Sequence, residues 1–564
     1  MEKCKFLSNV RSFLLLTHFF SLFLYNIANA QKQGDVWCFG QSALIDFSDP
    51  DNPIVGESSV DSRGSCSSVS TPDGQLLFYV SDIAQLDPDL PQEYLFAFSR
   101  WGVVYNRFNQ PMPNGYGLLG EAWYHEHVIL PMPNNSSKYY IFSLMATDPG
   151  VDTIIKGIYY SIVDMQADSG RGDVVLKNQS FYEYQGEVNN GTMFDGELAV
   201  QHGNGRDWWL YNAQTNGTYL PAHDTAILVR HLITPEGIFL DTTERISLTP
   251  DTTLVAGFGE MLLNPKGDKL MFLSKNGKLS EYTINRCTGE FELERVLYVS
   301  LYDTETNESL NETFLGALGE YSPNGNLFYL NVQSPLATQQ SYLYQLNLLD
   351  IDPFNSKYLI YDGYGTVDFD NNDFYADIPG ELKSAPDNKI YSATWLWSAY
   401  FNWPYSDTSD FSQVSMNLSV VNDPDSLGAA CNFQPYSFPL GGNNRSYWGL
   451  PNNPNYRIGP LDGSPCDTLG INALQEIKPN KRPKAFTYPN PAHETVWLSI
   501  GDKAYKNSAN PPVVTLYNVS GKKVFETKVQ QLPVQLNIGK LPAGIYSGRL
   551  TFIGAEYYFK VVKE

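Results

Sequence analysis

The strongest constraint on the fold is a unit that recurs four times along the chain. Each copy has a Gly-Glu pair, a short apolar run, a turn rich in Pro, Asn, Asp and Gly, and a second apolar run. The four glutamates, Glu197, Glu260, Glu320 and Glu381, are 63, 60 and 61 residues apart. A fixed period of this size indicates a repeat architecture, and a strand-turn-strand repeat is typical of a β-propeller blade.

Two similar units precede these four, and a partial one follows them. Trp448 to Tyr456 repeats the apolar run and turn without clear strands after it, and short strands near Trp37 and residues 44–47 can supply them. A ring closed by both chain ends leaves no free sheet edge. The sequence therefore predicts a β-propeller over residues 31–473, best counted as seven blades, with six or eight as the alternatives.

Composition supports an all-β fold and excludes one class of partner. The 564 residues include 44 Gly and 35 Pro, and 14% are aromatic, a profile that suits turn-rich β structure. The net charge is -23. A chain this acidic is repelled by phosphate backbones, so we expect no nucleic-acid partner.

The first thirty residues predict the destination of the chain. Lys3, Lys5 and Arg11 give a basic start, residues 13–24 are mostly apolar, and Ala28-Asn29-Ala30 provides a small-x-small cleavage site. The apolar run is shorter than the roughly 20 residues that a spanning helix needs. We therefore expect residues 1–30 to be a secretory signal peptide, with no transmembrane segment in the chain.

Five cysteines follow the predicted signal peptide, so at least one has no partner within the chain. Cys431 and Cys466 flank a segment rich in Pro, Gly and Asn, and we take them as the candidate disulfide. No pair has the Cys-x-x-Cys spacing of a zinc or redox site.

The last part of the chain has a different character. Residues 474–485 are polar and basic with two prolines, which indicates a linker. Residues 486–564 contain short alternating strands, and the turn at Asn518 to Gly521 predicts a hairpin. The sequence predicts a small β-sandwich of the immunoglobulin-like kind here.

Motifs within residues 486–564 resemble the C-terminal sorting domain of the type IX secretion system of the Bacteroidetes. They are Tyr488-Pro489-Asn490-Pro491-Ala492, Leu516-Tyr517-Asn518 with Gly521-Lys522, Leu541 to Tyr546, and the ending Phe559 to Glu564. The resemblance implies export to the periplasm and recognition by the secretion machinery at the outer membrane. Release from the cell or attachment to its surface would follow.

The body of the chain resembles the propeller-type proteins that often precede such sorting domains. The matching residues are Val36 to Gly40, Gly64 to Asp82, the segment around Cys287, and several segments between 428 and 470. This resemblance implies a fold and no particular activity, because propellers host many functions.

The repeated glutamates are the first candidate site. If each Gly-Glu opens the innermost strand of its blade, the four glutamates and Glu126 lie at one level around a channel mouth. Converging carboxylates attract a cation or serve as a catalytic acid and base. The structural alternative is that each accepts hydrogen bonds from backbone N–H groups of the next blade.

Two further groups have metal-ligand character. Asp368, Asp370 and Asn372 have the spacing of the first calcium-loop oxygens but lack the glycine and glutamate that complete such a loop, so a solvated acidic turn is the alternative. His125 and His127 are two residues apart on a predicted strand, so we expect them to face the same way. The sequence offers no clear third ligand for zinc.

An aromatic cluster in the sixth unit is the third candidate. Trp395, Trp397 and Trp403 lie in the insertion WLWSAYFNWPY. They suit a stacking platform for a sugar or peptide, and packing of the loop is the alternative.

These observations together favour a secreted or surface-displayed, non-enzymatic binding protein for a glycan, peptide or protein. The runner-up is a hydrolase or lyase that uses the acidic channel mouth with a divalent cation, for which calcium is the candidate. No Gly-x-Ser-x-Gly elbow, phosphate-binding loop or dinucleotide fingerprint occurs in the chain.

Overall fold

The computed structural model divides the chain into two compact units, residues 1–474 and residues 475–564. In the first unit it describes residues 31–467 apart from 63, 83–100, 121–124, 146–156, 184–195, 216–225, 247–258, 275–277, 299–316, 334–339, 365, 369–372, 376–377 and 396–414. In the second it describes residues 485–564 apart from 489, 501–504, 507–510, 519–521 and 553–554.

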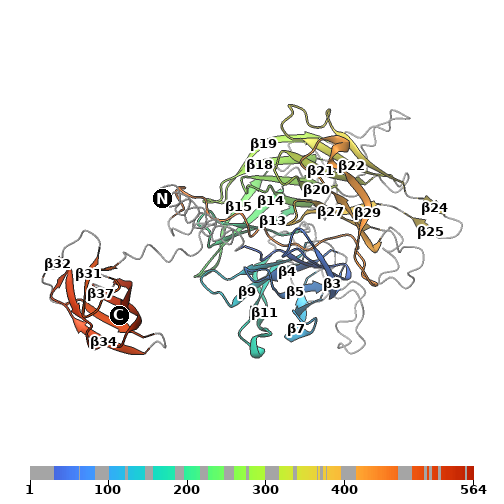
Figure 1. Ribbon diagram of the computed structural model, residues 1–564. Helices are drawn as coiled ribbons and strands as arrows, with labels where there is room; N and C mark the ends of the chain where they lie inside the picture. The colour runs from blue at the N-terminus through green and yellow to red at the C-terminus, as the bar shows by residue number, and fades with distance from the viewer. Residues whose placement is uncertain are drawn as a thin grey trace, which may run out of the picture. The chain divides into compact units, whose positions relative to one another are not determined.

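The first unit is a β-propeller of seven antiparallel sheets, numbered here as blades 1 to 7 in chain order (Figure 1). Blade 1 has three strands and the others have four. The strands are β1 (Val36–Phe39), β2 (Gln41–Asp46) and β3 (Ile54–Asp61) in blade 1; β4 (Cys66–Ser70), β5 (Leu76–Asp82), β6 (Trp101–Asn106) and β7 (Pro111–Leu119) in blade 2; β8 (His127–Pro131), β9 (Lys138–Met145), β10 (Gly157–Asp164) and β11 (Asp173–Glu183) in blade 3; β12 (Leu198–Gln201), β13 (Trp208–Thr215), β14 (Ala226–Thr234) and β15 (Gly237–Ile246) in blade 4; β16 (Gly259–Leu263), β17 (Lys269–Ser274), β18 (Lys278–Ile284) and β19 (Phe291–Tyr298) in blade 5; β20 (Ala317–Tyr321), β21 (Leu327–Gln333), β22 (Gln340–Asn347) and β23 (Tyr358–Tyr364) in blade 6; and β26 (Ile378–Ser384), β27 (Ile390–Trp395), β28 (Asn417–Val421) and β29 (Phe433–Pro439) in blade 7.

Three short elements complete the described part of the first unit. They are the hairpin of β24 (Thr366–Asp368) and β25 (Asp373–Tyr375), the 3-10 helix η2 (Asp168–Gly170) and the 3-10 helix η3 (Gly428–Cys431). None of the helices among the described residues is long and apolar enough to cross a membrane.

In blades 2 to 7 the first strand is the innermost one. Successive first strands, from β4 through β8, β12, β16 and β20 to β26, contact one another around the ring. Apolar clusters fill the space between neighbouring sheets, which explains why strands such as KYYIFSLM at residues 138–145 are apolar on both faces. The repeat predicted from the glutamates is therefore confirmed as a set of propeller blades.

The turns between first and second strands follow from their sequence. In the turn of residues 71–74, the amide of Gly74 donates to the carbonyl of Thr71 at 2.9 Å, and Gly74 has a φ of 95°. Such a positive φ favours glycine. Gly325 in the turn of blade 6 repeats the arrangement with a φ of 75°.

Blade 1 closes the ring with strands from the N-terminal side alone, whereas the sequence predicted a blade shared by both chain ends. Its three strands are consecutive at the N-terminal side of the propeller, and Trp37 and Phe47 pack against Tyr391 of blade 7. In Figure 1 the blue strands of blade 1 accordingly lie beside the orange strands of blade 7. The C-terminal side supplies no strand in the described residues. It makes an isolated bridge between Gln41 and Arg445.

Residues 444–467, named here the bridging segment, run past most of the blades after blade 7 ends. Trp448 accepts a hydrogen bond from the amide of Glu381 in blade 7 at 2.9 Å, and the amide of Asn452 donates to Cys66 of blade 2 at 2.8 Å. Farther along, Tyr456 donates its hydroxyl proton to the carbonyl of Ile129 in blade 3 at 2.8 Å. This segment thus takes the place of an innermost strand between blades 7 and 2 without forming a ladder.

The predicted disulfide is wrong, because the bridging segment carries Cys466 away from Cys431. Cys466 is bonded to Cys287 in blade 5, with 5.4 Å between their Cα atoms. Cys431 is buried at the end of η3 and is a free thiol, as are Cys38 and Cys66. The amide of Leu461 donates to Gly203 of blade 4 at 2.8 Å, which helps hold the segment where the disulfide forms.

The second unit is a small β domain with two main sheets around one apolar core. One sheet has the order β30 (Ala485–Tyr488), β31 (Thr495–Ile500), β36 (Val534–Asn537), and the other has the order β34 (Lys523–Lys528), β33 (Val513–Tyr517), β37 (Gly544–Phe552), β38 (Ala555–Lys563). A short pair, β32 (Tyr505–Lys506) and β35 (Gln531–Leu532), accompanies them. Val496, Leu498, Val514, Leu516 and Leu550 are fully buried between the sheets.

The motif around Asn490 has a clear structural purpose in this domain. Its side-chain amide donates to Thr487 at 2.9 Å and to the carbonyl of Lys560 at 2.7 Å, and its side-chain oxygen accepts from the amide of Val562 at 2.8 Å. Asn490 therefore ties the start of the domain to its last strand.

Candidate functional site

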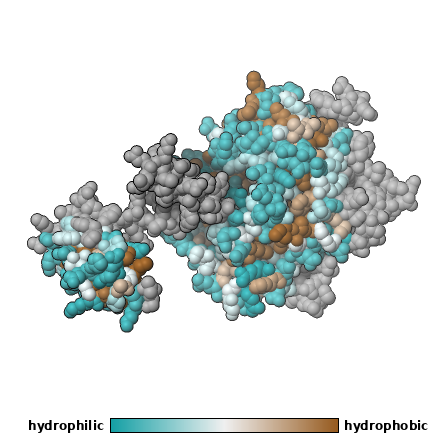
Figure 2. Space-filling view, in the orientation of Figure 1, coloured by the Kyte–Doolittle hydropathy of each residue, from teal (hydrophilic) through white to brown (hydrophobic). Residues whose placement is uncertain are grey.

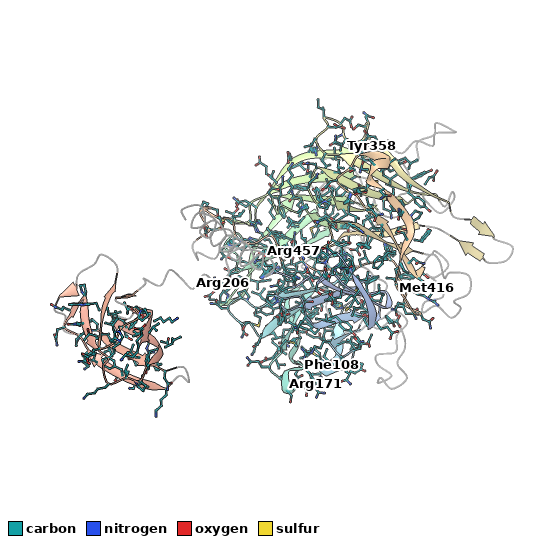
Figure 3. The ribbon with its side chains drawn as sticks, viewed as in Figure 1. Phe108, Arg171, Arg206, Tyr358, Met416 and Arg457 are labelled. Carbon is teal, nitrogen blue, oxygen red and sulfur yellow. A yellow bond between two sulfur atoms is a disulfide. The ribbon has the colours of Figure 1, made fainter. Side chains whose placement is uncertain are left out.

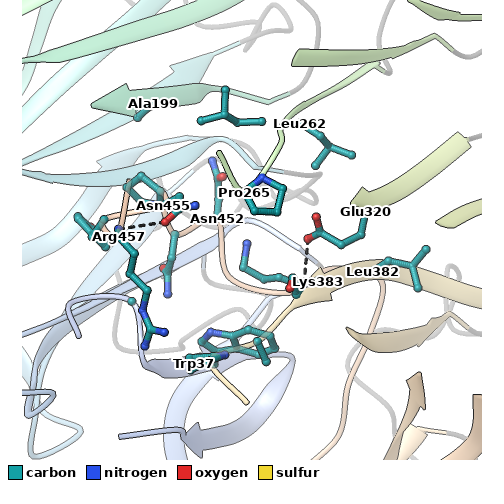
Figure 4. Close-up of a pocket in the computed structure, with 18 of the residues that line it drawn as sticks. Trp37, Ala199, Leu262, Pro265, Glu320, Leu382, Lys383, Asn452, Asn455 and Arg457 are labelled. Carbon is teal, nitrogen blue, oxygen red and sulfur yellow. Dashed lines mark hydrogen bonds between the residues drawn. The ribbon is translucent and has the colours of Figure 1, made fainter. Parts of the chain in front are cut away.

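A cavity of about 340 Å³ lies on the axis of the propeller (Figure 4). Its walls include Trp37 of blade 1, Leu198 of blade 4, Leu262 of blade 5, Glu320 of blade 6 and Lys383 of blade 7. Residues 452–457 of the bridging segment form another wall. Figure 3 places Arg457, one of these residues, near the middle of the propeller, whereas Phe108, Arg171 and Tyr358 lie at its periphery.

Three metal-ligating side chains converge at this axis. One ligand atom each of His125, Glu260 and Glu381 lies within 4.8 Å of the other two, and all three residues are buried. His125 Nε2 is 2.8 Å from Glu381 Oε1. These residues belong to blades 3, 5 and 7, which are not neighbours, so their side chains meet only because all three point toward the axis.

The position of His125 depends on an irregular backbone. It precedes β8 and has a φ of 56°, in the left-handed region that few non-glycine residues adopt. Its carbonyl accepts hydrogen bonds from the amide of Glu197 at 3.1 Å and from the side-chain amide of Asn452 at 3.3 Å. Blade 4 and the bridging segment therefore hold His125 in place.

His125 and His127 do not face the same site, contrary to the expectation. His127 lies inside β8, where Nε2 is 3.1 Å from Asp82 Oδ1 and Nδ1 is 3.1 Å from Ser143 Oγ. Strand alternation does not extend back to His125, because the left-handed residue lies outside the strand. His127 is a buried partner of Asp82 between blades 2 and 3.

Each of three predicted glutamates accepts a backbone hydrogen bond from the part of the chain that follows its own blade. Glu260 accepts from the amide of Gly319 in blade 6 at 2.9 Å, and Glu320 accepts from the amide of Ser384 in blade 7 at 2.8 Å. Glu381 accepts from the amide of Leu450 in the bridging segment. Their hydrogen bonds follow the structural alternative considered for the repeated glutamates, and Glu260 and Glu381 in addition belong to the axial cluster.

Glu126 and Glu197 are also buried, with exposures of 0% and 3%. Within the described part of the chain, neither carboxylate oxygen of Glu197 has a hydrogen-bond partner. Burial raises the pKa of Glu197 well above its ordinary value. The five predicted glutamates therefore do not form one even ring, since Glu260 and Glu381 meet His125 while Glu320 lines the cavity wall.

Glu320 has a pKa that is shifted by several neighbouring groups. Burial raises its pKa to about 7, while the nearby charge of Lys383 and the backbone hydrogen bonds from Ser384 and Tyr321 lower it. A carboxylic acid that titrates near neutral pH is suited to exchanging protons with a bound molecule.

The basic and amide groups of the cavity were not singled out from the sequence. Lys383 is half-buried, and no described residue forms a hydrogen bond or ion pair with its ammonium group. Arg457 pairs with the buried Asp35 at 2.6 Å. Asn452 and Asn455 add side-chain amides from the bridging segment. The run of asparagines in PNNPNY is the signal that could have indicated them.

Several other predicted site residues lie elsewhere. Asp368 ends β24, whereas Asp370 and Asn372 lie outside the described residues. Trp395 ends β27, and the rest of the predicted aromatic platform, Trp397 and Trp403, also lies outside them. The calcium loop and the platform therefore stay predictions.

One family model matches the chain. Residues 487–564 match the family described as the secretion system C-terminal sorting domain. The second unit is thus the sorting domain of the type IX secretion system that its motifs predict. The protein is exported through the periplasm to the outside or the outer surface of the cell, and its sorting domain engages the secretion machinery.

Solved structures with a similar arrangement are distant. A periplasmic gluconolactonase of Pseudomonas aeruginosa matches with a TM-score of 0.40 at 10% identity over 74% of this chain and 97% of that one. A putative 6-phosphogluconolactonase of Bacteroides fragilis gives a TM-score of 0.34 at 9% identity over 70% and 91%. A functionally unknown protein of Desulfotomaculum acetoxidans gives 0.36 at 10% identity over 74% and 99%.

At these scores and identities the likeness says nothing about what this propeller binds or converts. No curated protein matches the chain.

Proposed function

We propose that this exported propeller is a binding protein that takes up a small polar ligand in its axial cavity. The observation that carries the proposal is the cavity itself, whose volume of about 340 Å³ suits a small molecule. Its polar groups are placed by the innermost strands and the bridging segment, so they are positioned before any ligand arrives. Preorganisation of this kind lowers the entropic cost of binding.

The lining favours a saccharide or short peptide that carries an acidic group. The ammonium group of Lys383, which forms no hydrogen bond or ion pair with a described residue, suits a carboxylate, and the side-chain amide of Asn455 suits hydroxyl or peptide groups. Leu262 and Pro265 add apolar surface to the lining (Figure 4). Sugars and peptides have apolar faces as well as polar edges, so such a mixed lining suits both.

The test uses the full mature chain against panels of neutral and acidic oligosaccharides and peptides, with binding followed by calorimetry. Lys383→Ala is expected to weaken binding of an acidic ligand about tenfold or more, the usual size for loss of one charged hydrogen bond. Lys266→Ala is the matched control, because Lys266 is exposed on another blade and is not among the cavity-lining residues.

Two results would contradict the proposal that the cavity is the ligand-binding site. Trp397→Ala and Trp403→Ala test the aromatic platform, and loss of binding in these variants with none in Lys383→Ala would move the site to that loop. Absence of binding across the whole panel would reject the binding function.

A hydrolase or lyase is the second candidate, supported by the axial cluster and by the pKa of Glu320 near 7. It predicts that a bound ligand is converted with time and that a chelator stops the conversion. Chromatography of the ligand after long incubation measures this, and recovery of unchanged ligand would reject it.

A further inference from the structure

We propose that His125, Glu260 and Glu381 bind a divalent transition-metal ion, Zn²⁺ by preference, at the axis of the propeller. The inference deepens the proposed function, because His125 and Glu381 also line the cavity in which the ligand would bind. An ion held by these residues would be reachable by that ligand.

The geometry is the first support. Ligand atoms bound tetrahedrally to zinc at about 2.0–2.2 Å are about 3.3–3.6 Å from one another. The ligand atoms of the three residues already lie within 4.8 Å of one another. Small changes of side-chain torsion therefore suffice to form the site, and the backbones of three separate blades need not move.

The charge balance is the second support. The two carboxylates of the cluster, Glu260 and Glu381, are exposed by 3% and 1%. The basic groups that line the cavity are His125, Lys383 and Arg457, and Arg457 already pairs with Asp35. Like charges a few ångströms apart inside a protein repel strongly, and a cation between two of them reverses the sign of that interaction.

The donor set selects the class of metal. One imidazole nitrogen with two carboxylate oxygens suits zinc and its neighbours, whereas calcium takes oxygen ligands alone. Three protein ligands leave a fourth position of a tetrahedral zinc site for water or for the proposed ligand. Magnesium is disfavoured for the same reason as calcium.

The experiment measures metal binding directly on the full mature chain, stripped with a chelator and then titrated with Zn²⁺, Mn²⁺, Ca²⁺ or Mg²⁺. We expect Zn²⁺ to bind at one equivalent and to raise the melting temperature, with Ca²⁺ and Mg²⁺ giving no shift. Glu260→Gln and Glu381→Gln keep an oxygen that accepts the backbone hydrogen bond. Each is expected to weaken Zn²⁺ binding by at least the 10–100-fold that loss of an outer contact costs.

Glu236→Gln is the control. Glu236 is an exposed glutamate in the turn between β14 and β15 that accepts a hydrogen bond from the Thr234 hydroxyl, and it belongs to neither the cluster nor the cavity lining. It should bind Zn²⁺ as the unmodified protein does. Equal loss in all three variants, or an unmodified protein that binds none of the four ions, would overturn the proposal.

The result is separable from the ligand-binding proposal. One equivalent of Zn²⁺ bound by a protein that recognises no saccharide or peptide supports the metal site and rejects only the binding function. Saccharide or peptide binding by a protein that takes up no metal supports the binding function and rejects only the metal site.

Discussion

Glutamates of the innermost strands hold consecutive parts of this ring together, each through a hydrogen bond with the part that follows. Glu260 reaches blade 6, Glu320 reaches blade 7, and Glu381 reaches the bridging segment, in each case through a backbone amide. Hydrogen bonds to a charged acceptor are stronger than neutral ones, and a donor left unpaired inside the ring would be costly. The repeated Gly-Glu pair is therefore explained first by packing, and its chemistry depends on which glutamates meet at the axis.

Asp61 provides a pH-dependent prediction at the same scale. It ends β3, and burial raises its pKa to about 7 from the ordinary 3.8. Among the described residues its Oδ1 has no hydrogen-bond partner. Between these two pH values the folded state keeps a proton that the unfolded state has lost, so the free energy of unfolding falls as pH rises, by about 1.4 kcal/mol per pH unit for one group.

Asp61→Asn removes this titration. The variant is expected to gain stability relative to the unmodified protein as pH rises from 4 to 7, and to gain no more above 7. Melting temperatures of both proteins across that range measure the effect, and the difference between them cancels the contribution of other acids. A difference that does not change with pH would contradict the assignment of this titration to Asp61.

At the scale of elements, the bridging segment connects the two ends of the propeller more than any strand does. It bonds to blades 7, 2, 3 and 4 in turn, and Arg286 of blade 5 donates to the carbonyl of Gly459 at 2.7 Å. The Cys287–Cys466 disulfide then fastens it, with a sequence separation of 179 between the two cysteines. The segment also supplies a wall of the axial cavity, so its anchoring and the shape of the site are linked.

Cys287→Ser and Cys466→Ser are expected to destabilise the propeller by about 2–5 kcal/mol, because the reduced chain gains entropy when it unfolds. Chemical denaturation of each variant measures this, and the unmodified protein with reductant should resemble the variants. The variants themselves should not respond to reductant. A reductant effect that persists in them would mean that another pair of cysteines is involved.

At the scale of the whole molecule, the chain combines an export signal with a scaffold for a site. The second unit carries the sorting domain, and the first carries the axial cavity. The face of the propeller in Figure 2 is mainly hydrophilic, in keeping with a net charge of -23 and with a protein that works outside the cell.

Deletion of residues 486–564 should leave the protein in the periplasm, because the machinery at the outer membrane no longer recognises it. Fractionation of cells followed by immunodetection locates the truncated and full-length chains. Asn490→Ala, which removes three hydrogen bonds to Thr487, Lys560 and Val562, should reduce export without abolishing synthesis. Surface delivery of the truncated chain at the full level would contradict the role assigned to the sorting domain.

Features that depend on local pattern could be predicted from the amino-acid sequence. The period of the glutamates and the turns after them predicted the blades, and the motifs around Asn490 and Leu541 predicted the sorting domain. Both rest on residues close together in the chain, where turn chemistry and strand alternation act directly.

Contacts between residues far apart in the chain could not be predicted in this way, because they depend on the path of the folded chain. Cys466 bonds to Cys287 because the bridging segment passes blades 2, 3 and 4 after it leaves blade 7, a path that no local pattern encodes. His125 lies beside Glu260 and Glu381 because side chains from three alternate blades point to one axis. Strand alternation had predicted instead that His125 faces the same way as His127, which pairs with Asp82. A site on the axis of a closed ring forms only when the ring closes. The residues that compose it therefore cannot be identified from the sequence of any one blade.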